Sequence, residues 1–398
     1  MDQAVPFVAP LSGSRPPVVL QVLPALVTGG VERGTIDVAA ALAEAGWTAI
    51  VASEGGPMAR ELSRVGAEHI TLPLASKNPL TIRRNADRLS ELIEQRGVDI
   101  VHARSRAPAW SAWMAAGRTN RHFVTTFHGT YNLGWFGLKN RYNSVMTRGE
   151  RVIAISEFIA EHAWRIYGVD PERIRVVPRG IDLSRFDPAR VSPERIIQLA
   201  QKWRLPDGYQ VIMLPGRLTR WKGQAVLIEA MALLDRRDLR CLLVGSDQGR
   251  TDYRDYLVDL VHRRRLGDIV HLAGECNDMP AAYMLTDVVV SASTDPEAFG
   301  RVAVEGQAMG RAVIATDHGA SAETVLPGQT GWLTPPGDAE ALAKALDRFL
   351  ALNSDGRDSM ARRAMDHVRA KFTKETMCAR TLAVYDEVLS QPVPLRLP

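Results

Sequence analysis

Two glutamates, a glycine and the start of an apolar run are the residues whose types and spacing best support chemistry. Glu297 and Glu305 have seven residues between them, and Gly300 lies within that interval in the sequence PEAFGRVAVEGQAMG. A helix starting near Phe299 would direct its first N–H groups and the positive end of its dipole toward an anion, most naturally a phosphate. Phe299 and Gly300, at that start, are expected to bind the same ligand. Glu297 would then face a reacting sugar from the loop, while Glu305 would reach a ribose hydroxyl from roughly two turns inside the helix.

A second group of residues carries positive charge in a strand-to-helix turn. After the apolar segment QVIMLP, the sequence GRLTRWKG places Arg217 and Lys222 five residues apart. Two cations in such a turn can hold both phosphates of a nucleoside diphosphate and offset the charge that builds as it departs. The tips of the next two predicted strands, at Gly245 and Glu275, are expected to line the pocket for the base.

A glycine pair occupies the corresponding turn near the start of the chain. Gly29 and Gly30 follow the apolar strand VVLQVLPAL and precede an amphipathic helix that is predicted to begin near Glu32. Backbone N–H groups at such a turn can approach an anion closely. The pair lacks the third glycine of a dinucleotide fingerprint, which argues against a nicotinamide or flavin cofactor. A simple packing role for the two glycines is the alternative.

Polar side chains follow two further strands, VDIVHAR and HFVTTFHG. In open α/β sheets, ligands bind at the carboxyl ends of the parallel strands. We therefore expect Arg104 and Arg106 to bind the acceptor, and His128 to lie beside a sugar. A hydrogen-bonded structural histidine is the alternative for His128.

Alternating strand and helix patterns organise these residues into an α/β protein. A chain of 398 residues exceeds what a single core usually holds, so two doubly wound, Rossmann-like domains are expected. The predicted parts are a flexible leader at 1–16, an acceptor-binding domain at 17–185, a linker at 186–207, a nucleotide-sugar-binding domain at 208–372 and a final helix at 373–390.

The order of these pieces resembles glycosyltransferase family 4, the retaining GT-B enzymes that often serve lipopolysaccharide and envelope polysaccharide assembly. GRLTRWKG and PEAFGRVAVEGQAMG are the most specific matches, and VVPRGID with Phe186 resembles the sequence that closes the family's first domain. The resemblance covers roughly residues 18–390. It implies two domains facing one another across a cleft, closure that brings Gly29 and Gly30 onto the diphosphate, and a final helix that crosses back to the first domain.

The resemblance also implies roles for individual residues. Glu297 would orient the donor sugar, His128 would contact it, and Arg217 and Lys222 would hold the departing diphosphate. The glycosidic bond would form with retention, the leaving phosphate accepting the proton of the incoming hydroxyl. This chain has Gly129 after His128 where many members have aspartate, which leaves the role of a second acid open.

Composition narrows the classes of function. Hydrophobic residues make up 46% of the chain and charged residues 24%, as in ordinary soluble globular proteins. The three cysteines show no C-x-x-C spacing, which indicates neither a disulfide framework nor a zinc site. No D-x-D triplet occurs, so we expect no metal and no cofactor beyond the UDP-sugar or GDP-sugar donor. No signal peptide or membrane-spanning run is recognisable, which favours a cytoplasmic protein.

The net charge is +4, and the positive excess lies in residues 1–185. Within that half, residues 131–151 interleave aromatic side chains such as Trp135 and Phe136 with basic ones such as Arg148. Such a segment suits contact with an anionic membrane surface or a lid over the acceptor. We expect a saccharide or lipid-linked acceptor at the inner face of the cytoplasmic membrane. No signature of nucleic-acid binding is present.

Three other interpretations compete with a retaining transferase. A sugar-nucleotide epimerase on the same fold would need no acceptor. A non-catalytic nucleotide-sugar-binding protein would lack Glu297, Arg217 or Lys222, and all three are present. An inverting transferase would need a base near the acceptor, for which His128 is the only good candidate.

Overall fold

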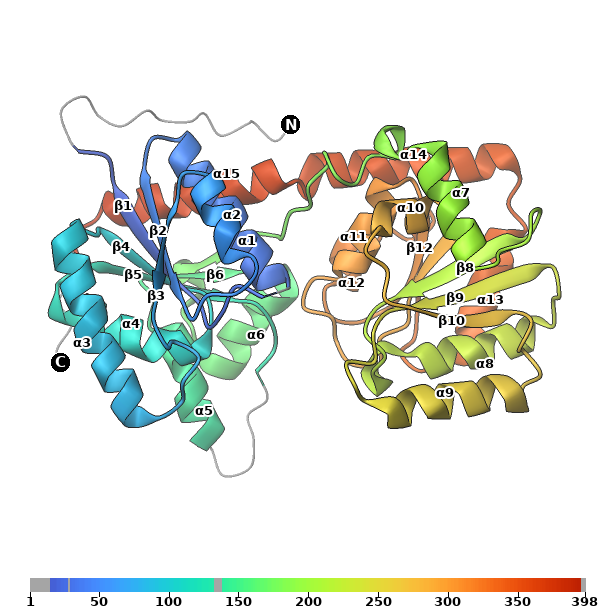
Figure 1. Cartoon of the computed structure of the whole chain (residues 1–398), viewed down its shortest axis with the longest axis horizontal. Coiled ribbons are helices and arrows are strands. Elements are labelled where there is room, and N and C mark those ends of the chain that lie inside the picture. The colour runs from blue at the N-terminus through green and yellow to red at the C-terminus, as the bar shows by residue number, and fades with distance from the viewer. Residues whose placement is uncertain (1–14, 28, 132–137, 395–398) are drawn as a thin grey trace. The chain divides into compact units, whose positions relative to one another are not determined.

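The computed structural model describes residues 15–27, 29–131 and 138–394. The chain folds into two compact units, of which the first comprises residues 1–180 and 374–398 and the second residues 181–373. Each unit is a parallel sheet with helices on both faces (Figure 1). Residues 1–14 of the predicted leader and 132–137 of the predicted membrane or lid segment lie outside the described residues.

The first unit contains a seven-stranded parallel sheet in the order β3-β2-β1-β4-β5-β6-β7. All five residues of β1 are buried, as expected for a central strand that is covered on both faces. The strands are β1 Val18–Val22, β2 Thr48–Ser53, β3 Glu68–Thr71, β4 Ile100–Ala103, β5 His122–Phe127, β6 Arg151–Ala154 and β7 Ile174–Val176.

The helices of the first unit are α1 Gly30–Glu44, α2 Ala59–Arg64, α3 Pro79–Arg96, α4 Arg106–Arg118, α5 Leu138–Asn143, α6 Glu157–Tyr167 and α15 Lys374–Leu389. Apolar side chains of α1 and α15 form one core with β1 and β2, and Tyr385 of α15 is completely buried there. Figure 1 shows α3 and α4 on the other side of this sheet. The final helix is therefore an integral part of the first unit's core.

Local sequence explains where the helices of this unit begin and end. Before α3, the Asn78 side chain accepts a hydrogen bond from the N–H of Leu80 at 2.9 Å, and Pro79 occupies the first helical position. Gly97 ends the same helix in the left-handed conformation at φ 60°. Ser156 caps α6 in the same manner as Asn78 caps α3, by accepting from the N–H of Ile159.

The second unit contains a six-stranded parallel sheet in the order β10-β9-β8-β11-β12-β13. Its strands are β8 Gln210–Pro215, β9 Leu239–Val244, β10 Val270–Gly274, β11 Val288–Ser291, β12 Ala312–Thr316 and β13 Gly331–Thr334. The helices are α7 Pro193–Lys202, α8 Gln224–Leu234, α9 Thr251–Arg263, α10 Met279–Met284, α11 Arg301–Ala308, α12 Ser321–Thr324, α13 Ala339–Leu350 and α14 Ser354–Lys371.

Helices α8, α9 and α13 share one core with the second sheet. Figure 1 shows α10, α11 and α14 on its other side. The segment 186–207, predicted as a linker, contains α7 and belongs to the second unit. There Arg195 of α7 pairs with Asp278 at 2.6 Å.

Strand order reverses once in each sheet, between β1 and β4 in the first unit and between β8 and β11 in the second. At such a point the loops after the two strands diverge to opposite faces and leave a crevice outside the carboxyl ends, where ligands bind. The predicted site residues follow these four strands in most cases. The predicted α/β class with two doubly wound domains is confirmed.

Candidate functional site

The switch point of the first unit brings the glycine pair and Arg104 to the same sheet edge. Gly29 and Gly30 lie at the start of α1, where the carbonyl of Gly29 accepts from the N–H of Arg33 at 3.1 Å. Arg104 follows β4 directly and is buried, with 5% of its surface exposed. Its Nη1 donates to Oε1 of Gln21 on β1 at 2.9 Å. Arg104 therefore ties the ends of the two central strands together.

One nitrogen of Arg104, Nε, is buried without a hydrogen-bond partner among the described residues. Within the same described part of the chain, no carboxylate lies within ion-pair distance of the guanidinium. Burial lowers the pKa of Arg104 from its ordinary value, and Tyr385, Cys378 and Asp37 act in the opposite direction. An arginine remains charged under these conditions, so this edge of the sheet is positive.

His128 directly follows β5 and lines the same small cavity as Arg104. Its Nδ1 is 2.9 Å from Nη2 of Arg179, and because arginine can only donate, Nδ1 must accept. Nε2 therefore carries the proton of the neutral ring, and it is buried with no partner among the described residues. Burial, followed by the charges of Arg179 and Arg104, lowers the pKa of His128 well below its ordinary value.

Arg179 is not predicted as a site residue from the sequence, although it lies in the motif VVPRGID. Besides His128, it donates through Nη1 to the carbonyl of Gly30, the first residue of α1. Arg104, His128 and Arg179 line a small cavity of about 10 Å³, which is room for a single water molecule. A charged residue within a motif that otherwise marks the end of the first domain is the signal that could have identified Arg179.

Arg106 is directed elsewhere. It begins α4, and its Nη1 donates to Oδ1 of Asn143 at 2.9 Å. Its guanidinium also lies over the ring of Tyr131, 4.3 Å from the centroid. Burial raises the pKa of Tyr131 to about 12, with Arg106 acting in the opposite direction. Both Arg104 and Arg106 are predicted to bind the acceptor, and the structure gives the two side chains different protein partners.

In the second unit, the turn after β8 contains both predicted cations. Arg217 is exposed and forms no ion pair within the described ranges, while its carbonyl accepts from Nε2 of Gln224 at 2.9 Å. Lys222 ends a short 3₁₀ helix, Arg220–Lys222. Gly223 follows at φ 73°, and a Cβ there would lie 1.8 Å from the carbonyl oxygen of Ala292. Only glycine allows the turn after β8 to contact the turn after β11 this closely.

Lys222 and Glu297 meet across that contact. The Lys222 ammonium donates to Oε1 of Glu297, and the hydroxyl of Ser293 donates to the same oxygen at 2.6 Å. The Lys222 and Glu297 side chains are only 16% and 13% exposed. Lys222 also lies over the ring of Trp221 at 4.3 Å. The sequence assigns Lys222 to the diphosphate and Glu297 to the sugar, and in the structure the two side chains form one cluster. Ser293, which the sequence patterns do not predict as a site residue, is its third member.

Helix α11 begins two residues later than predicted, at Arg301. Gly300 precedes it in the left-handed conformation at φ 80°, which favours glycine. The side chain of Phe299 is buried, and its ring packs edge-on against Phe372 at 5.6 Å. Phe299, predicted to bind the donor, therefore has only its backbone available for a ligand.

Glu305 lies about one turn inside α11, with 8% of its surface exposed. The hydroxyl of Tyr283 donates to Oε2 at 3.1 Å, and Nη2 of Arg301 donates to Oε1 at 2.8 Å. Burial and the neighbouring carboxylate raise the pKa of Tyr283 well above its ordinary value. The two partners hold the carboxylate at one position and leave lone pairs on both oxygens for a ligand. Arg301 precedes Glu305 by four residues in the same helix, a spacing from which this ion pair can be predicted in the sequence.

The remaining two predicted donor residues lie at the tips of β9 and β10. The N–H of Gly245 donates to the carbonyl of Gly274 at 2.8 Å, which joins the two tips. Glu275 follows β10 and is exposed. Both stand at the carboxyl edge of the second sheet, on the β10 side of the switch point.

Within the described residues, no group of three His, Cys, Asp or Glu side chains is placed to hold a metal ion. None of the helices that the structure describes is both long and apolar enough to cross a membrane. At the second switch point, Lys222 brings a positive charge to Glu297, which lies four residues before the start of α11, and Arg217 belongs to the same turn as Lys222. This arrangement can bind an anion with protein donors and hold a carboxylate beside it.

Two family models match the chain. Residues 28–185 match the model described as Glycosyltransferase Family 4, and residues 196–367 match the model described as Glycosyl transferases group 1. A D-inositol 3-phosphate glycosyltransferase from Xylanimonas cellulosilytica is 30% identical over 309 residues, which cover 72% of this chain and 71% of the relative.

Solved structures agree with these matches. A glycosyltransferase from Rickettsia africae ESF-5 is 40% identical, with a TM-score of 0.89 over 95% of this chain and 100% of the other. HepE from Anabaena, solved in complex with UDP, is 25% identical, with a TM-score of 0.80 over 93% of this chain and 100% of the other. The matches to sequence and structure together show that the chain belongs to glycosyltransferase family 4 and has the GT-B fold.

Proposed function

We propose that this protein transfers a hexose from a UDP-sugar or GDP-sugar to a saccharide or lipid-linked acceptor, with retention at the anomeric carbon. The observation that carries the proposal is the cluster of Lys222, Ser293 and Glu297 beside the amino end of α11. It combines a cation for phosphate with a half-buried carboxylate for sugar hydroxyls. The complex of the similar protein HepE with UDP supports a nucleotide-linked donor.

In this proposal the diphosphate binds to Arg217 and Lys222 and to the first N–H groups of α11. Glu297 then orients the donor sugar, and Glu305 accepts the ribose hydroxyls. Lys222 is held by Glu297 in the described structure, so an incoming phosphate oxygen would share this ammonium with the carboxylate. Ammonium groups carry three donors, which allows both contacts at once. The developing charge on the leaving phosphate is offset by these two cations, and we propose that no metal is required.

The protonation of His128 favours retention over inversion. An inverting transferase needs a base that takes the proton of the acceptor hydroxyl. Nδ1 of His128 already accepts from Arg179, and the proton on Nε2 makes that nitrogen a donor. His128 can therefore donate a hydrogen bond to a sugar oxygen but cannot accept the acceptor's proton. With this candidate base occupied, the leaving phosphate remains as the proton acceptor.

The acceptor is proposed to belong to lipopolysaccharide core or envelope polysaccharide assembly at the inner face of the cytoplasmic membrane. Arg104 is buried at the first switch point, and its Nε has no partner among the described residues, which favours an acceptor that carries a negative group. The name of the Xylanimonas relative refers to an acceptor with a phosphate. Lys139 and Arg141 are exposed on α5 and could contact an anionic membrane surface.

An epimerase on the same fold and a non-catalytic binding protein are the alternatives. The epimerase would convert the donor with no acceptor present, and the binding protein would bind the donor with no turnover. A half-buried carboxylate held in a fixed position by Lys222 and Ser293 favours catalysis over simple binding, because a charged group that is positioned in advance needs little reorganisation during a reaction.

The test is a thermal-shift screen of the purified protein with UDP, GDP, ADP and their sugar conjugates, with and without EDTA. A rise of several degrees with UDP or GDP that EDTA does not change is expected, and it would identify the donor class. The anomeric configuration of the product made from that donor, determined by NMR, then distinguishes retention from inversion. No shift with any nucleotide would contradict the proposed diphosphate site.

A further inference from the structure

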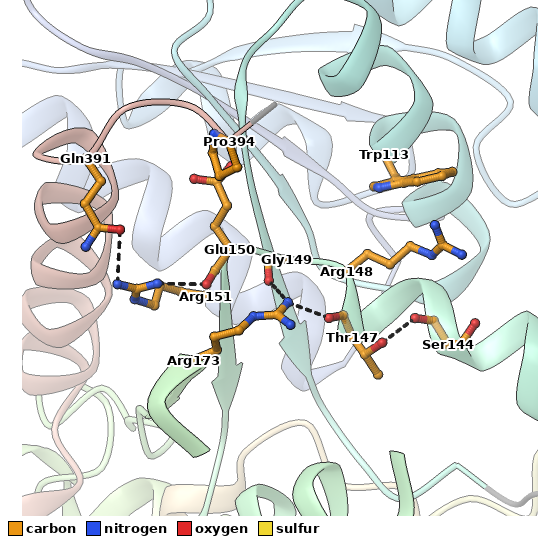
Figure 2. A pocket seen from close by; sticks show the side chains of 10 residues that line it. All are labelled: Trp113, Ser144, Thr147, Arg148, Gly149, Glu150, Arg151, Arg173, Gln391 and Pro394. Carbon is orange, nitrogen blue, oxygen red and sulfur yellow. Dashed lines mark hydrogen bonds between the residues drawn. The ribbon is translucent and has the colours of Figure 1, made fainter. Parts of the chain in front are cut away.

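A cavity of about 690 Å³ lies in the first unit, away from the switch point of that unit. It is formed at the amino ends of β6 and β7, whereas His128 and Arg104 follow the carboxyl ends of their strands. Figure 2 shows its lining side chains, which come from α4, the segment 144–151, the turn before β7 and the residues after α15. The volume is that of a small-molecule site, for which about 300–1,000 Å³ is usual.

The walls of this cavity carry more positive than negative charge. Arg173 donates through Nη2 to the carbonyls of Thr147, at 2.7 Å, and Gly149. Arg148 is exposed, and its guanidinium lies over the ring of Trp113 at 4.1 Å (Figure 2). In the described part of the chain, neither arginine has a carboxylate within ion-pair distance. Carbonyls and an aromatic face hold these two cations in place without neutralising them.

Among the described residues, Glu150 is the acid that lines the cavity, and its carboxylate already has other partners. The Glu150 carboxylate accepts from the N–H of Phe123 at 3.0 Å and lies 2.7 Å from Nδ1 of His122. Arg151 shares Glu387 with Arg175, so two guanidinium groups face one carboxylate there. The cavity therefore has a net positive charge from Arg148 and Arg173.

The hydroxyl groups of the cavity indicate a second property of the ligand. Ser144 donates its proton to the carbonyl of Arg141 at 2.7 Å, and Thr147 donates to the carbonyl of Ser144 at 2.8 Å. Both oxygens therefore offer lone pairs to the cavity, where they can accept hydrogen bonds from ligand hydroxyls. A ligand that satisfies both the cations and these acceptors carries an anionic group and several hydroxyl groups.

We propose that this cavity is a second binding site, for a phosphorylated saccharide. The phosphate would bind to Arg148 and Arg173, and the sugar hydroxyls would donate to Ser144 and Thr147. The site shares no residue with the proposed donor and acceptor sites and does not depend on the transfer reaction. Arg148 and Arg173 of this cavity contribute to the excess of positive charge in residues 1–185.

The test is isothermal titration calorimetry of the full chain with glucose 6-phosphate, glucose and inorganic phosphate, in the presence of saturating UDP. Glucose 6-phosphate is expected to bind more tightly than either of the other two. The Arg148→Gln variant should weaken this binding roughly ten-fold, the usual effect of losing one charge-assisted hydrogen bond. Ser144→Ala should weaken glucose 6-phosphate more than inorganic phosphate, which provides a second variant with a smaller perturbation.

Arg165→Gln is the matched control. Arg165 is also exposed and lies 5.5 Å from the ring centroid of Trp164, but it belongs to α6 and does not line the cavity. Its variant should bind as the unaltered protein does. Three results would overturn the proposal: loss of glucose 6-phosphate binding when UDP is added, unchanged binding in Arg148→Gln, or inorganic phosphate binding as tightly as the sugar phosphate.

Discussion

Glu297 is the residue on which the proposed chemistry depends most directly. Its Oε1 accepts from both Lys222 and Ser293, so the carboxylate has a fixed position before any ligand arrives. A group positioned in advance requires little reorganisation during the reaction. Ser293 contributes only through this contact and is therefore a positioning residue in the proposal.

Glu297→Gln should lower kcat by about 100-fold or more and change donor KM little, because the amide keeps the shape of the side chain and loses its charge. Initial rates with the donor found in the thermal-shift screen measure this. Asp295→Asn is the control, since Asp295 is an exposed acid two residues away. Equal losses in both variants would contradict a specific role for Glu297.

Glu305 is expected to act in binding more than in turnover. Removing its charge leaves Arg301 and Tyr283 in place but weakens the acceptor for ribose hydroxyls. Glu305→Gln should raise the dissociation constant for the nucleotide by roughly ten-fold, since hydrogen bonds to charged groups contribute about 1.5–3 kcal/mol. Calorimetric titration with UDP or GDP measures this.

The exposed acid Glu340 at the start of α13 gives a matched control for Glu305. Glu340→Gln should leave nucleotide affinity unchanged. Nucleotide binding by Glu305→Gln at unaltered strength would mean that the ribose is held elsewhere.

At the scale of elements, the site of the second unit depends on how closely two turns approach. The turn after β8 carries Lys222, the turn after β11 carries Glu297, and Gly223 is the point of contact between them. Helix α11 then follows from Gly300, whose left-handed conformation sets the direction of its amino end. The contact between Lys222 and Glu297 therefore depends on the backbone conformation of neighbouring glycines.

Gly223→Ala should destabilise the second unit by about 3 kcal/mol or more, because left-handed strain of roughly 1–2 kcal/mol is added to the cost of overpacking. Thermal unfolding measures the change. Gly249→Ala is an unusually close control, since Gly249 has nearly the same φ, 77°, but a Cβ there would have no atom within 4 Å. It should cost only the strain, and equal losses in the two variants would show that the contact with Ala292 is unimportant.

At the scale of the whole molecule, buried histidines link folding to pH. Burial, followed by neighbouring arginines, lowers the pKa of both His102 and His128 well below the ordinary value of 6.5. His102 is held between Tyr385 of α15 and Thr126 of β5, at 2.6 and 2.7 Å. Below pH 6.5 the unfolded chain binds protons at these positions that the folded chain does not. The free energy of unfolding must therefore fall as the pH decreases below 6.5.

The expected slope is at most about 1.4 kcal/mol per pH unit for each of the two histidines. Urea unfolding at pH 7.5, 6.5 and 5.5 measures it. His128→Gln should reduce the slope, while His262→Gln, at an exposed position on α9, should not. A stability that is constant between pH 6.5 and 5.5 would contradict neutral, buried histidines in the folded protein.

Much of the fold could be predicted, because the apolar runs of strands and the periodic apolar positions of helices indicate within a short segment which residues will be buried. The position of α11 shows where this fails. The apolar run beginning at Val302 predicts a helix from Phe299, but the backbone at Gly300 turns left-handed and the helix begins at Arg301. Sequence periodicity does not specify the φ angle at a single glycine, and Glu305 consequently lies one turn inside the helix instead of two.

The sequence alone determined which residue types follow the strand ends, and hence that phosphate-binding cations and carboxylates would collect at two sheet edges. Strand order is a long-range property, so only the tertiary structure decided which edges these are and which side chains meet there. It joined Lys222 to Glu297, gave Arg104 and Arg106 different partners, and buried the Phe299 side chain in the core. It also placed Arg179 against His128, a contact between residues 51 positions apart that fixes the histidine's proton. Such contacts depend on how distant segments pack, which no local pattern encodes.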